Sequence, residues 1–288
     1  MSLPIVVYYF FAFWLLFVFI GVILSFRLTR RYFLDIEKKP TEVGLKYKDI
    51  SFVTEDGIRL KGWWIPVRGS DKVVIQLHGH SGSIDPDIQY LPELHQHGYH
   101  VLMFDFRGHG RSEGKVVTFG YLERRDVLAA VQFVKQRGYH RIALLGFSMG
   151  GMLAMLTAAI CPDVRAVVSD GAPVRLRTAL REWCFEHHIP RWLGALIARW
   201  VLIGVSIRLR VNIFTYDPVR WVGRIAPRPL LLIHGELDPY IPDFEDLVHA
   251  AGQGCQVWRV SDVGHTQASQ QYTEQYYGRI TEFLNANL

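Results

Sequence analysis

Six short apolar runs, separated by segments with helical patterns, most constrain the fold of this 288-residue chain. Each run ends in or leads into a polar motif that contains glycine. The runs cover residues 73–77, 101–105, 142–145, 164–169, 230–234 and 257–260, and helical patterns cover residues 121–137, 149–160, 244–251 and 270–284. This alternation predicts an α/β fold, a mostly parallel sheet with helices on both faces. Ligand sites in such sheets lie at the carboxyl ends of strands, where these motifs fall.

The amino-terminal segment has the composition of a membrane-spanning helix. Residues 1–26 contain no charged side chain, and residues 5–26 are almost wholly apolar. Twenty-two helical residues rise about 33 Å, enough to cross a hydrocarbon core of about 30 Å. The alternatives are a cleaved signal peptide, which carries its basic residues before the apolar run, and a core helix, which is seldom apolar on every face. Here Arg27, Arg30 and Arg31 follow the run, which predicts an uncleaved, single-pass anchor with the rest of the chain in the cytoplasm.

The chain is therefore predicted to have three parts. Residues 1–26 form the transmembrane anchor, residues 27–48 a basic linker and residues 49–288 a catalytic domain. The domain begins with two strands, at residues 50–54 and 60–67, which an E-D-G turn joins into a hairpin.

Composition excludes several classes of protein. Half of the residues are apolar and 20% are charged, which excludes a disordered chain as well as collagen-like and coiled-coil proteins. The three cysteines, Cys161, Cys184 and Cys255, are too few for a disulfide framework and lack the spacing of metal ligands. Unpaired cysteines agree with a reducing compartment.

The segment Gly146-Phe147-Ser148-Met149-Gly150 matches the G-x-S-x-G pattern of a nucleophile elbow. Glycines two residues before and after the serine leave room for a sharp turn from strand to helix. The start of that helix also places the backbone N–H of Met149 beside the serine, as a donor to an anion. The alternative is a glycine-rich turn without chemistry. Because an apolar strand precedes the motif and a helix of small residues follows it, we expect Ser148 to be the nucleophile.

A serine hydroxyl needs a base to take its proton, and the base needs an acid to orient it. His265, in the D-V-G-H-T segment after the last apolar run, is the predicted base, because the order along the chain is then Ser…Asp…His. Asp238, in G-E-L-D, is the predicted acid. Asp170 and Glu236 are the alternative acids, and Asp238 can also be a turn residue before Pro239.

The loop after the first apolar run supplies the second predicted oxyanion donor. The backbone N–H of His80 is expected to join that of Met149, while His78 props the loop. The pair His78 and His80 and the pair His95 and His97 can also be interpreted as metal ligands. No carboxylate or cysteine accompanies either pair at ligand spacing, so we expect no metal.

A dinucleotide cofactor is not expected either. Residues 104–112 read F-D-F-R-G-H-G-R-S, and the glycines at 108, 110 and 114 do not follow the G-x-G-x-x-G pattern. We expect a structural turn beside the site, and no organic cofactor.

Taken together, the motifs resemble those of the α/β-hydrolase superfamily. The matching segments are H-G-H-S-G, D-F-R-G-H-G-R-S, G-F-S-M-G-G, G-E-L-D and G-H-T, in this order across about residues 50–288. The pattern G-I-R-L-K-G-W-W-I-P is similar to membrane-anchored α/β-hydrolase-domain proteins and to bacterial serine aminopeptidase-like hydrolases. The resemblance implies the α/β-hydrolase fold, a Ser148, Asp238 and His265 triad, and an oxyanion hole from the His80 and Met149 amides. It leaves the substrate open, because this one fold serves esterases, lipases, thioesterases, peptidases, acyltransferases and inactive members.

A cap is predicted at about residues 174–228, where the alternation of strands and helices breaks. This segment holds ten arginines, no lysine and three acids, so the chain's positive surplus lies in it. Residues 191–210 have the pattern of a helix with an arginine-containing arc and an otherwise apolar surface that includes Trp192, Leu196, Trp200 and Ile203. Three interpretations stay open: a helix packed on the core, a helix in a membrane interface, and a clamp for an anionic substrate. No nucleic-acid-binding motif accompanies the arginines.

The sequence thus predicts a membrane-anchored serine hydrolase that cleaves a carboxylic ester or thioester of a lipid-like acyl group. One alternative is a peptidase or aminopeptidase-like amide hydrolase, for which Glu182 and Glu186 are the cap carboxylates that could bind a free amino terminus. The other is a membrane-tethered binding module without catalysis, against which the intact serine, aspartate and histidine argue.

Overall fold

The computed structural model describes residues 3–33, 37–80 and 82–288. Residues 1–2 of the predicted anchor, 34–36 of the predicted linker and Ser81 of the H-G-H-S-G loop lie outside the described residues.

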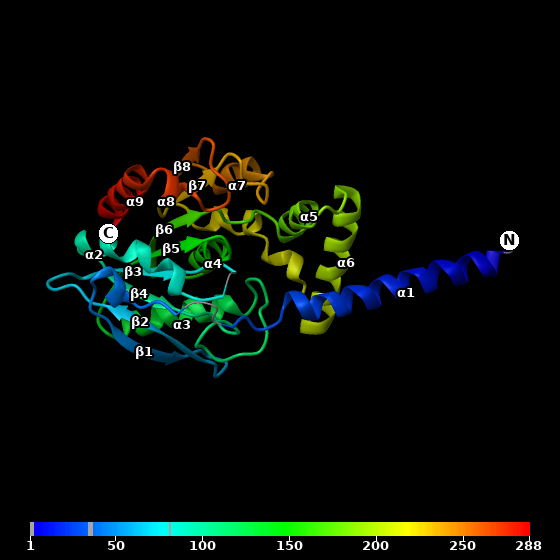
Figure 1. The fold of residues 1–288 in the computed structure, drawn as a ribbon, viewed down its shortest axis with the longest axis horizontal. Helices are drawn as coiled ribbons and strands as arrows, with labels where there is room; N and C mark the ends of the chain where they lie inside the picture. Colours follow the sequence, from blue (N-terminus) through cyan, green and yellow to red (C-terminus); the bar gives the residue numbers. More distant parts are fainter. Residues whose placement is uncertain (1–2, 34–36, 81) are drawn as a thin grey trace.

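The described residues form one sheet of eight strands in the order β1-β2-β4-β3-β5-β6-β7-β8 (Figure 1). The predicted hairpin is present, since β1 pairs antiparallel with β2, and β2 pairs antiparallel with β4. All other neighbours are parallel, which confirms the predicted fold class. The strands are β1 (Lys48–Val53), β2 (Arg59–Ile65), β3 (Lys72–Leu77), β4 (His100–Phe104), β5 (Arg141–Phe147), β6 (Val164–Asp170), β7 (Leu230–Gly235) and β8 (Cys255–Val260).

Burial explains why the inner strands are continuous apolar runs. Every residue of β4 and β7 is buried, whereas exposed and less exposed residues alternate in the edge strand β8. Strands covered on both faces need apolar side chains at every position. Successive side chains therefore enter two cores; Val73 and Ile75 point to one, and Val74 points to the other.

Helices cover both faces of the sheet. One core includes side chains of α3 (Glu123–Lys135), α4 (Met149–Ala158) and α7 (Phe244–Ala251). The other includes side chains of η2 (Asp85–Tyr90), α2 (Leu91–Gln96), α8 (Ala268–Gln271) and α9 (Thr273–Asn287). The helix predicted at 270–284 is divided between α8 and α9, because the backbone at Tyr272 leaves the helical region.

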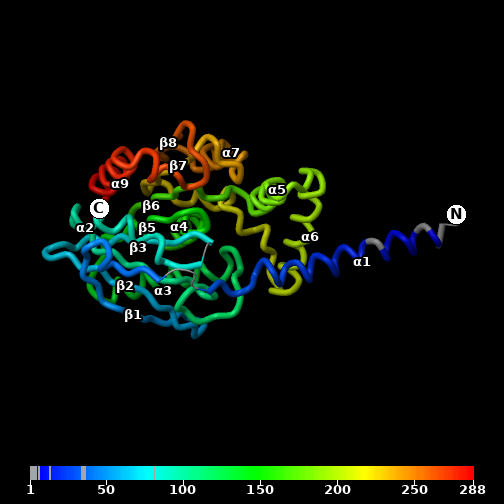
Figure 2. The backbone as a smooth tube through the Cα atoms, viewed as in Figure 1, coloured from blue at the N-terminus to red at the C-terminus, as the bar shows by residue number. Residues whose placement is uncertain are grey.

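The region predicted as a cap lies between β6 and β7. It consists of α5 (Leu176–Glu186), α6 (Arg191–Leu209) and three short helices, η3 (Ile213–Tyr216), η4 (Pro218–Arg220) and η5 (Val222–Arg224). The helices α5 and α6 stand at one end of the sheet, away from α9 (Figure 2).

The long apolar helix α1 (Leu3–Leu28) projects away from the body and meets the rest of the chain mainly at α6 (Figure 1). Its length and composition make it a candidate membrane span, and α6 passes the same test.

The segment predicted as a linker is attached to the body. Arg30 forms a β-bridge with Val116, and the Tyr32 amide donates to the carbonyl of Gly108 at 2.8 Å. The Arg31 guanidinium donates to the carbonyls of Gly110 and Gly114 at 2.9 and 2.8 Å. The short helix η1 (Pro40–Val43) then leads into β1. Residues 29–33 therefore form a strap across the loop that follows β4.

Candidate active site

Ser148 occupies the sharp turn between β5 and α4. Its φ of 52° and ψ of −114° are strained for a residue with a side chain, and such strain is common at functional sites. A Cβ at Gly146 would overlap the carbonyl of Gly150, and a Cβ at Gly150 would overlap that of Leu77. The two glycines therefore allow α4 to start directly against the sheet. The Ser148 amide donates to the Asp170 carbonyl at 2.8 Å, which ties the turn to β6.

The three residues predicted as a triad are joined by hydrogen bonds. His265, in the loop after β8, has its Nε2 2.9 Å from Ser148 Oγ and its Nδ1 2.7 Å from Asp238 Oδ2. Asp238 follows β7 and is buried, and its Oδ1 accepts the backbone N–H of Tyr240 at 2.9 Å. With a proton on Nδ1, His265 presents a lone pair on Nε2 to the serine hydroxyl.

The two alternative acids do not reach His265. Asp170 is buried at the end of β6 and accepts the hydroxyl of Tyr276 at 2.8 Å; burial raises the pKa of Asp170 to about 6. Glu236 is exposed. Asp170 instead supports the serine turn through its backbone carbonyl.

The two segments that carry the predicted oxyanion donors both lie next to Ser148. Met149 is the first residue of α4, where the backbone N–H has no intrahelical acceptor. A Cβ at Gly79 would lie 3.6 Å from Ser148 Cβ, so the loop that carries His80 passes beside Ser148. The roles of both amides remain predictions.

His78 holds this loop against the end of β4. Its Nε2 accepts the backbone N–H of Phe106 at 3.1 Å, and its Nδ1 lies 2.6 Å from the Gly79 carbonyl. The ring is buried, which lowers the pKa of His78 well below its usual value and keeps it neutral. This arrangement agrees with the structural role expected from the sequence.

The His80 ring belongs to an aromatic cluster that sequence reasoning missed. It stacks on Phe119 at 4.7 Å between centroids and meets the edge of Tyr32 at 4.4 Å, while Tyr32 stacks on His109 at 5.4 Å. Burial lowers the pKa of His80 to about 3, so the ring is neutral where it packs against Tyr32 and Phe119. Tyr32 comes from the strap, and its only signal in the sequence is an aromatic residue within a basic segment.

The histidine pairs do not assemble a metal centre among the residues that the structure describes, where no group of three or more His, Cys, Asp or Glu side chains has metal-binding geometry. His78 is engaged as described, and His97 lies on the exterior, 3.3 Å from Glu93.

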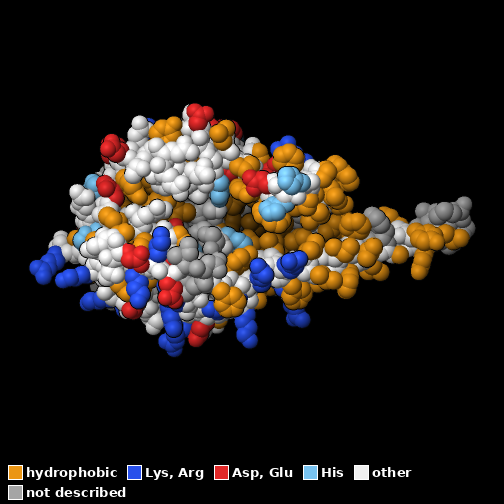
Figure 3. Space-filling model, viewed as in Figure 1, with side chains coloured by type: hydrophobic (Ala, Val, Ile, Leu, Met, Phe, Trp, Pro, Cys, Tyr) orange, Lys and Arg blue, Asp and Glu red, His pale blue; other side chains and the backbone are white. Residues whose placement is uncertain are grey.

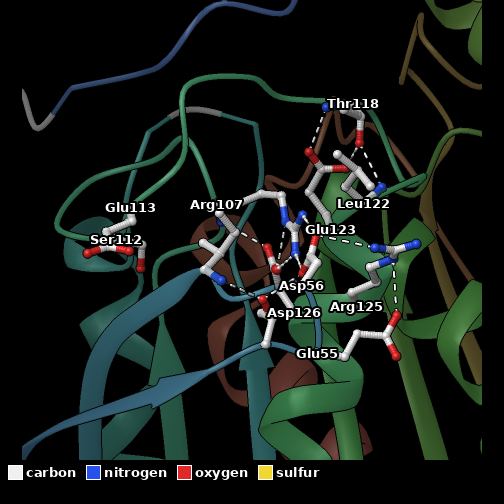
Figure 4. Close-up of polar contacts among 12 residues, drawn as sticks. Glu55, Asp56, Arg107, Ser112, Glu113, Thr118, Leu122, Glu123, Arg125 and Asp126 are labelled. Carbon is white, nitrogen blue, oxygen red and sulfur yellow. Dashed lines mark hydrogen bonds and ion pairs between the residues drawn. The ribbon is translucent and has the colours of Figure 1, made fainter. Parts of the chain in front are cut away.

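Residues 104–112 form a structural turn, held by a network of ion pairs. The Arg107 guanidinium binds Asp56 and Asp126, each at 2.7 Å, and the side chains of this network converge as Figure 4 shows. Arg111 binds both oxygens of the Asp85 carboxylate at 2.7 Å. This turn contacts the strap and contributes His109 to the His80 cluster. Its arginines therefore have a structural role next to the site.

Tyr240 connects the triad to the cap. Its ring lies edge-on to His265 at 5.0 Å, and its hydroxyl donates to Glu186 at the end of α5. The other cap carboxylate, Glu182, is buried and bound by Arg181 at 2.6 Å and Arg191 at 3.1 Å. Tyr240 therefore links Glu186 to His265.

A hollow lies between the body and the cap, and its visible walls are mostly hydrophobic (Figure 3). The cap helix α5 exposes two large apolar side chains, Trp183 and Phe185. Leu237 is also exposed, in the loop that carries Asp238.

Comparison with known proteins agrees with the observed fold. The family model described as alpha/beta hydrolase fold matches residues 72–189. Esterase Pf2001 of Pyrococcus furiosus is similar in structure, with a TM-score of 0.73 and 29% identity over 90% of this chain and 98% of that one. A second structure of that esterase is 30% identical, with a TM-score of 0.71, over 88% and 98% of the two chains.

Two relatives are similar in sequence. The uncharacterized protein YfhR of Escherichia coli O157:H7 is 28% identical over 82% of this chain and 80% of its own length. The lysophosphatidylserine lipase ABHD12 of Danio rerio is 30% identical over 73% of this chain and 60% of its own length.

Proposed function

We propose that this chain, which belongs to the α/β-hydrolase family, is a membrane-anchored serine hydrolase that cleaves carboxylic esters of lipid-like acyl groups. The observation that carries the proposal is the chain of hydrogen bonds from Asp238 through His265 to Ser148. The likeness to an esterase of known structure supports an ester as the substrate.

The proposed reaction has two steps. Ser148 Oγ attacks the substrate carbonyl while His265 Nε2 takes the hydroxyl proton, and Asp238 stabilises the imidazolium that forms. The amides of Met149 and His80 donate to the oxyanion of the tetrahedral intermediate. His265 then gives its proton to the leaving alcohol, and in the second step it activates a water that releases the acid. A thioester would follow the same course, with a thiol as the leaving group. None of these steps needs a metal or an organic cofactor.

Three features support a lipid-like substrate at a membrane. The helix α1 is long and apolar enough to span a bilayer, and arginines follow it, which favours a cytoplasmic domain. The hollow beside the cap has mostly hydrophobic walls (Figure 3). One relative is named as a lipase of lysophosphatidylserine, a membrane lipid with a single acyl chain.

A second candidate is the hydrolysis of aminoacyl amides. Glu186 supports it, because the contact with Tyr240 places this carboxylate beside the residue that touches His265. A panel of esters of increasing chain length, acyl thioesters and aminoacyl amides tests both candidates. Faster hydrolysis of the aminoacyl amide than of every ester would reject the lipid-like substrate.

Labelling by a fluorophosphonate tests the nucleophile. We expect the native chain to react, Ser148→Ala to lose the label, and the exposed control variant Ser261→Ala to label as the native chain does. Unchanged labelling of Ser148→Ala would reject Ser148 as the nucleophile. A native chain that does not react with the probe would favour the binding module without catalysis.

A further inference from the structure

The cap helix α6 packs along the second half of α1. The ring of Trp200 meets Trp14 and Phe17, each at 6.0 Å between centroids. At the other end of this contact, the Arg208 guanidinium reaches the Ser25 carbonyl at 3.5 Å and donates to the Thr29 hydroxyl. The contact therefore extends along α1 from Trp14 to the first residue beyond its end.

Between these ends the two backbones touch. A Cβ at Gly204 would overlap the carbonyl of Gly21, and a Cβ at Gly21 would overlap that of Trp200. Gly21, Ser25 and Thr29, spaced four residues apart, are buried on one face of the helix. A stripe of small residues at this spacing lets helices approach closely in membranes, where packing replaces the hydrophobic effect as the source of association.

The basic flank of α1 decides where α6 must lie. The uncharged run ends at Phe26, where Arg27 begins the basic flank, and Trp14 lies about 18 Å back along the helix from Phe26. If α1 spans the bilayer, the segment covered by α6 must therefore be inside it. Gly21, the point of backbone contact, lies about 7.5 Å along the helix from Phe26, which agrees with the 5–10 Å to which an interfacial helix sinks.

The free surface of α6 suits this position. Trp192 is 73% exposed and Ile207 is 55% exposed, so both ends of α6 present a large apolar side chain to the surroundings. Arg199 and Arg210 are exposed as well. Arginines beside an apolar face are typical of helices that lie in the surface of a membrane with anionic lipids.

We propose that α6 is an interfacial helix, embedded in the leaflet next to the catalytic domain and fixed there by α1. Its partner is the lipid bilayer, with acyl chains against Trp192 and Ile207 and lipid phosphates against the arginines. The proposal rests on the anchoring of α1 and deepens the proposed function, because it places the cap at the level of the lipid substrate.

Spin-label accessibility tests this position. The full chain carrying Cys255→Ser is reconstituted into nanodiscs of phosphatidylcholine and phosphatidylglycerol; Cys161 and Cys184 are buried and need no change. A nitroxide is attached in separate samples at Trp192→Cys and Ile207→Cys of α6. Ile20→Cys of α1 and Glu274→Cys of α9 are exposed controls for lipid and water. Relaxation by oxygen, which enriches in lipid, is compared with relaxation by a water-soluble nickel chelate.

We expect the nitroxides at positions 192 and 207 to resemble the one at position 20, with an oxygen-to-nickel ratio several-fold above that at position 274. Ratios equal to that at position 274, with position 20 still in lipid, would overturn the embedding of α6. A low ratio at position 20 as well would overturn the anchor and the proposal together. Fluorophosphonate labelling of Ser148 in the same nanodiscs is independent of all four ratios, so it separates failure of this proposal from failure of the hydrolase assignment.

Discussion

The ring of Tyr32 lies edge-on to the ring of His80, with their centroids 4.4 Å apart. Tyr32 follows the apolar helix α1 by four residues, and His80 carries one of the two proposed oxyanion donors. The segment that follows α1 therefore packs against the loop that carries His80.

We predict that Tyr32→Ala lowers kcat about tenfold with a smaller change in KM. The loop of His80 would lose its packing partner, and the His80 backbone N–H would no longer be aligned with the oxyanion. Tyr32→Phe keeps the ring and should retain native activity. Steady-state kinetics on a soluble ester measure both. Tyr47→Ala is a matched control, since Tyr47 is also half-buried and packs on Trp63 at 5.7 Å. Equal losses of kcat in Tyr32→Ala and Tyr47→Ala would contradict a positioning role for Tyr32.

A second prediction separates the two buried aspartates. Asp238→Asn should lower kcat/KM by about 10⁴, because an amide can no longer hold His265 in the productive tautomer. Asp170→Asn should lower it less than tenfold, since the Asp170 backbone carbonyl still accepts the Ser148 amide. The comparison is made on one ester at neutral pH. A larger loss in Asp170→Asn than in Asp238→Asn would reverse the assignment of the acid.

Asp170 also predicts a pH dependence of stability. Burial raises the pKa of Asp170 to about 6, above its value of about 4 in an unfolded chain, so the native state holds this proton more tightly. The contribution of this proton to the free energy of unfolding is complete below about pH 4. It is lost as the pH rises through about 6, and the total loss is up to roughly 3 kcal/mol. Asp170→Asn removes this titration. The free energy of unfolding should therefore decline less between pH 4 and pH 7.5 in the variant than in the native chain. Equal declines in the two chains would exclude Asp170 as the source of the pH dependence.

The glycine contact between α1 and α6 gives a prediction about packing. Gly204→Ala should lower the free energy of unfolding by about 1–3 kcal/mol, because the added methyl group meets the Gly21 backbone. Gly278→Ala in α9 is the control: a Cβ there meets nothing within 4 Å, and alanine favours a helix by up to about 1 kcal/mol. Unfolding in one detergent measures both. A Gly204→Ala chain as stable as Gly278→Ala would show that the two helices separate freely.

The last prediction concerns the carboxylate of the cap. Glu186→Gln should leave ester hydrolysis within about twofold, because Glu186 touches the Tyr240 hydroxyl and none of the three proposed catalytic residues. Hydrolysis of an aminoacyl amide should fall much further if this carboxylate binds an amino terminus. Parallel assays on an ester and an amide decide the matter. A large loss on the ester would place Glu186 in the proposed ester-hydrolysing machinery.

The parts of the fold that depend on local pattern could be predicted from the sequence. The apolar run before Ser148 became β5, the run before Asp238 became β7, and residues 244–251 became α7 with the same bounds. Strand ends meet at one edge of a parallel sheet, so their motifs came together without any knowledge of long-range contacts.

Features that depend on contacts between distant segments could not be predicted. The linker gave no sign that Tyr32 would pack on His80, because an aromatic residue in a basic segment has many possible partners. The sequence offers Glu182 as a candidate to bind a free amino terminus, but Arg181 and Arg191 bind it. The apolar face of the helix at residues 191–210 had three interpretations, and the structure shows that α1 covers part of it.

The contact between Arg208 and Ser25 joins residues that are 183 positions apart. A ribosome adding about 5–20 residues per second needs roughly 10–40 s to make the chain between them. During that interval the surface of α6 that covers Gly21 does not yet exist. The helix α1 therefore completes its packing late in biosynthesis, because α6 can cover it only after the cap has been made.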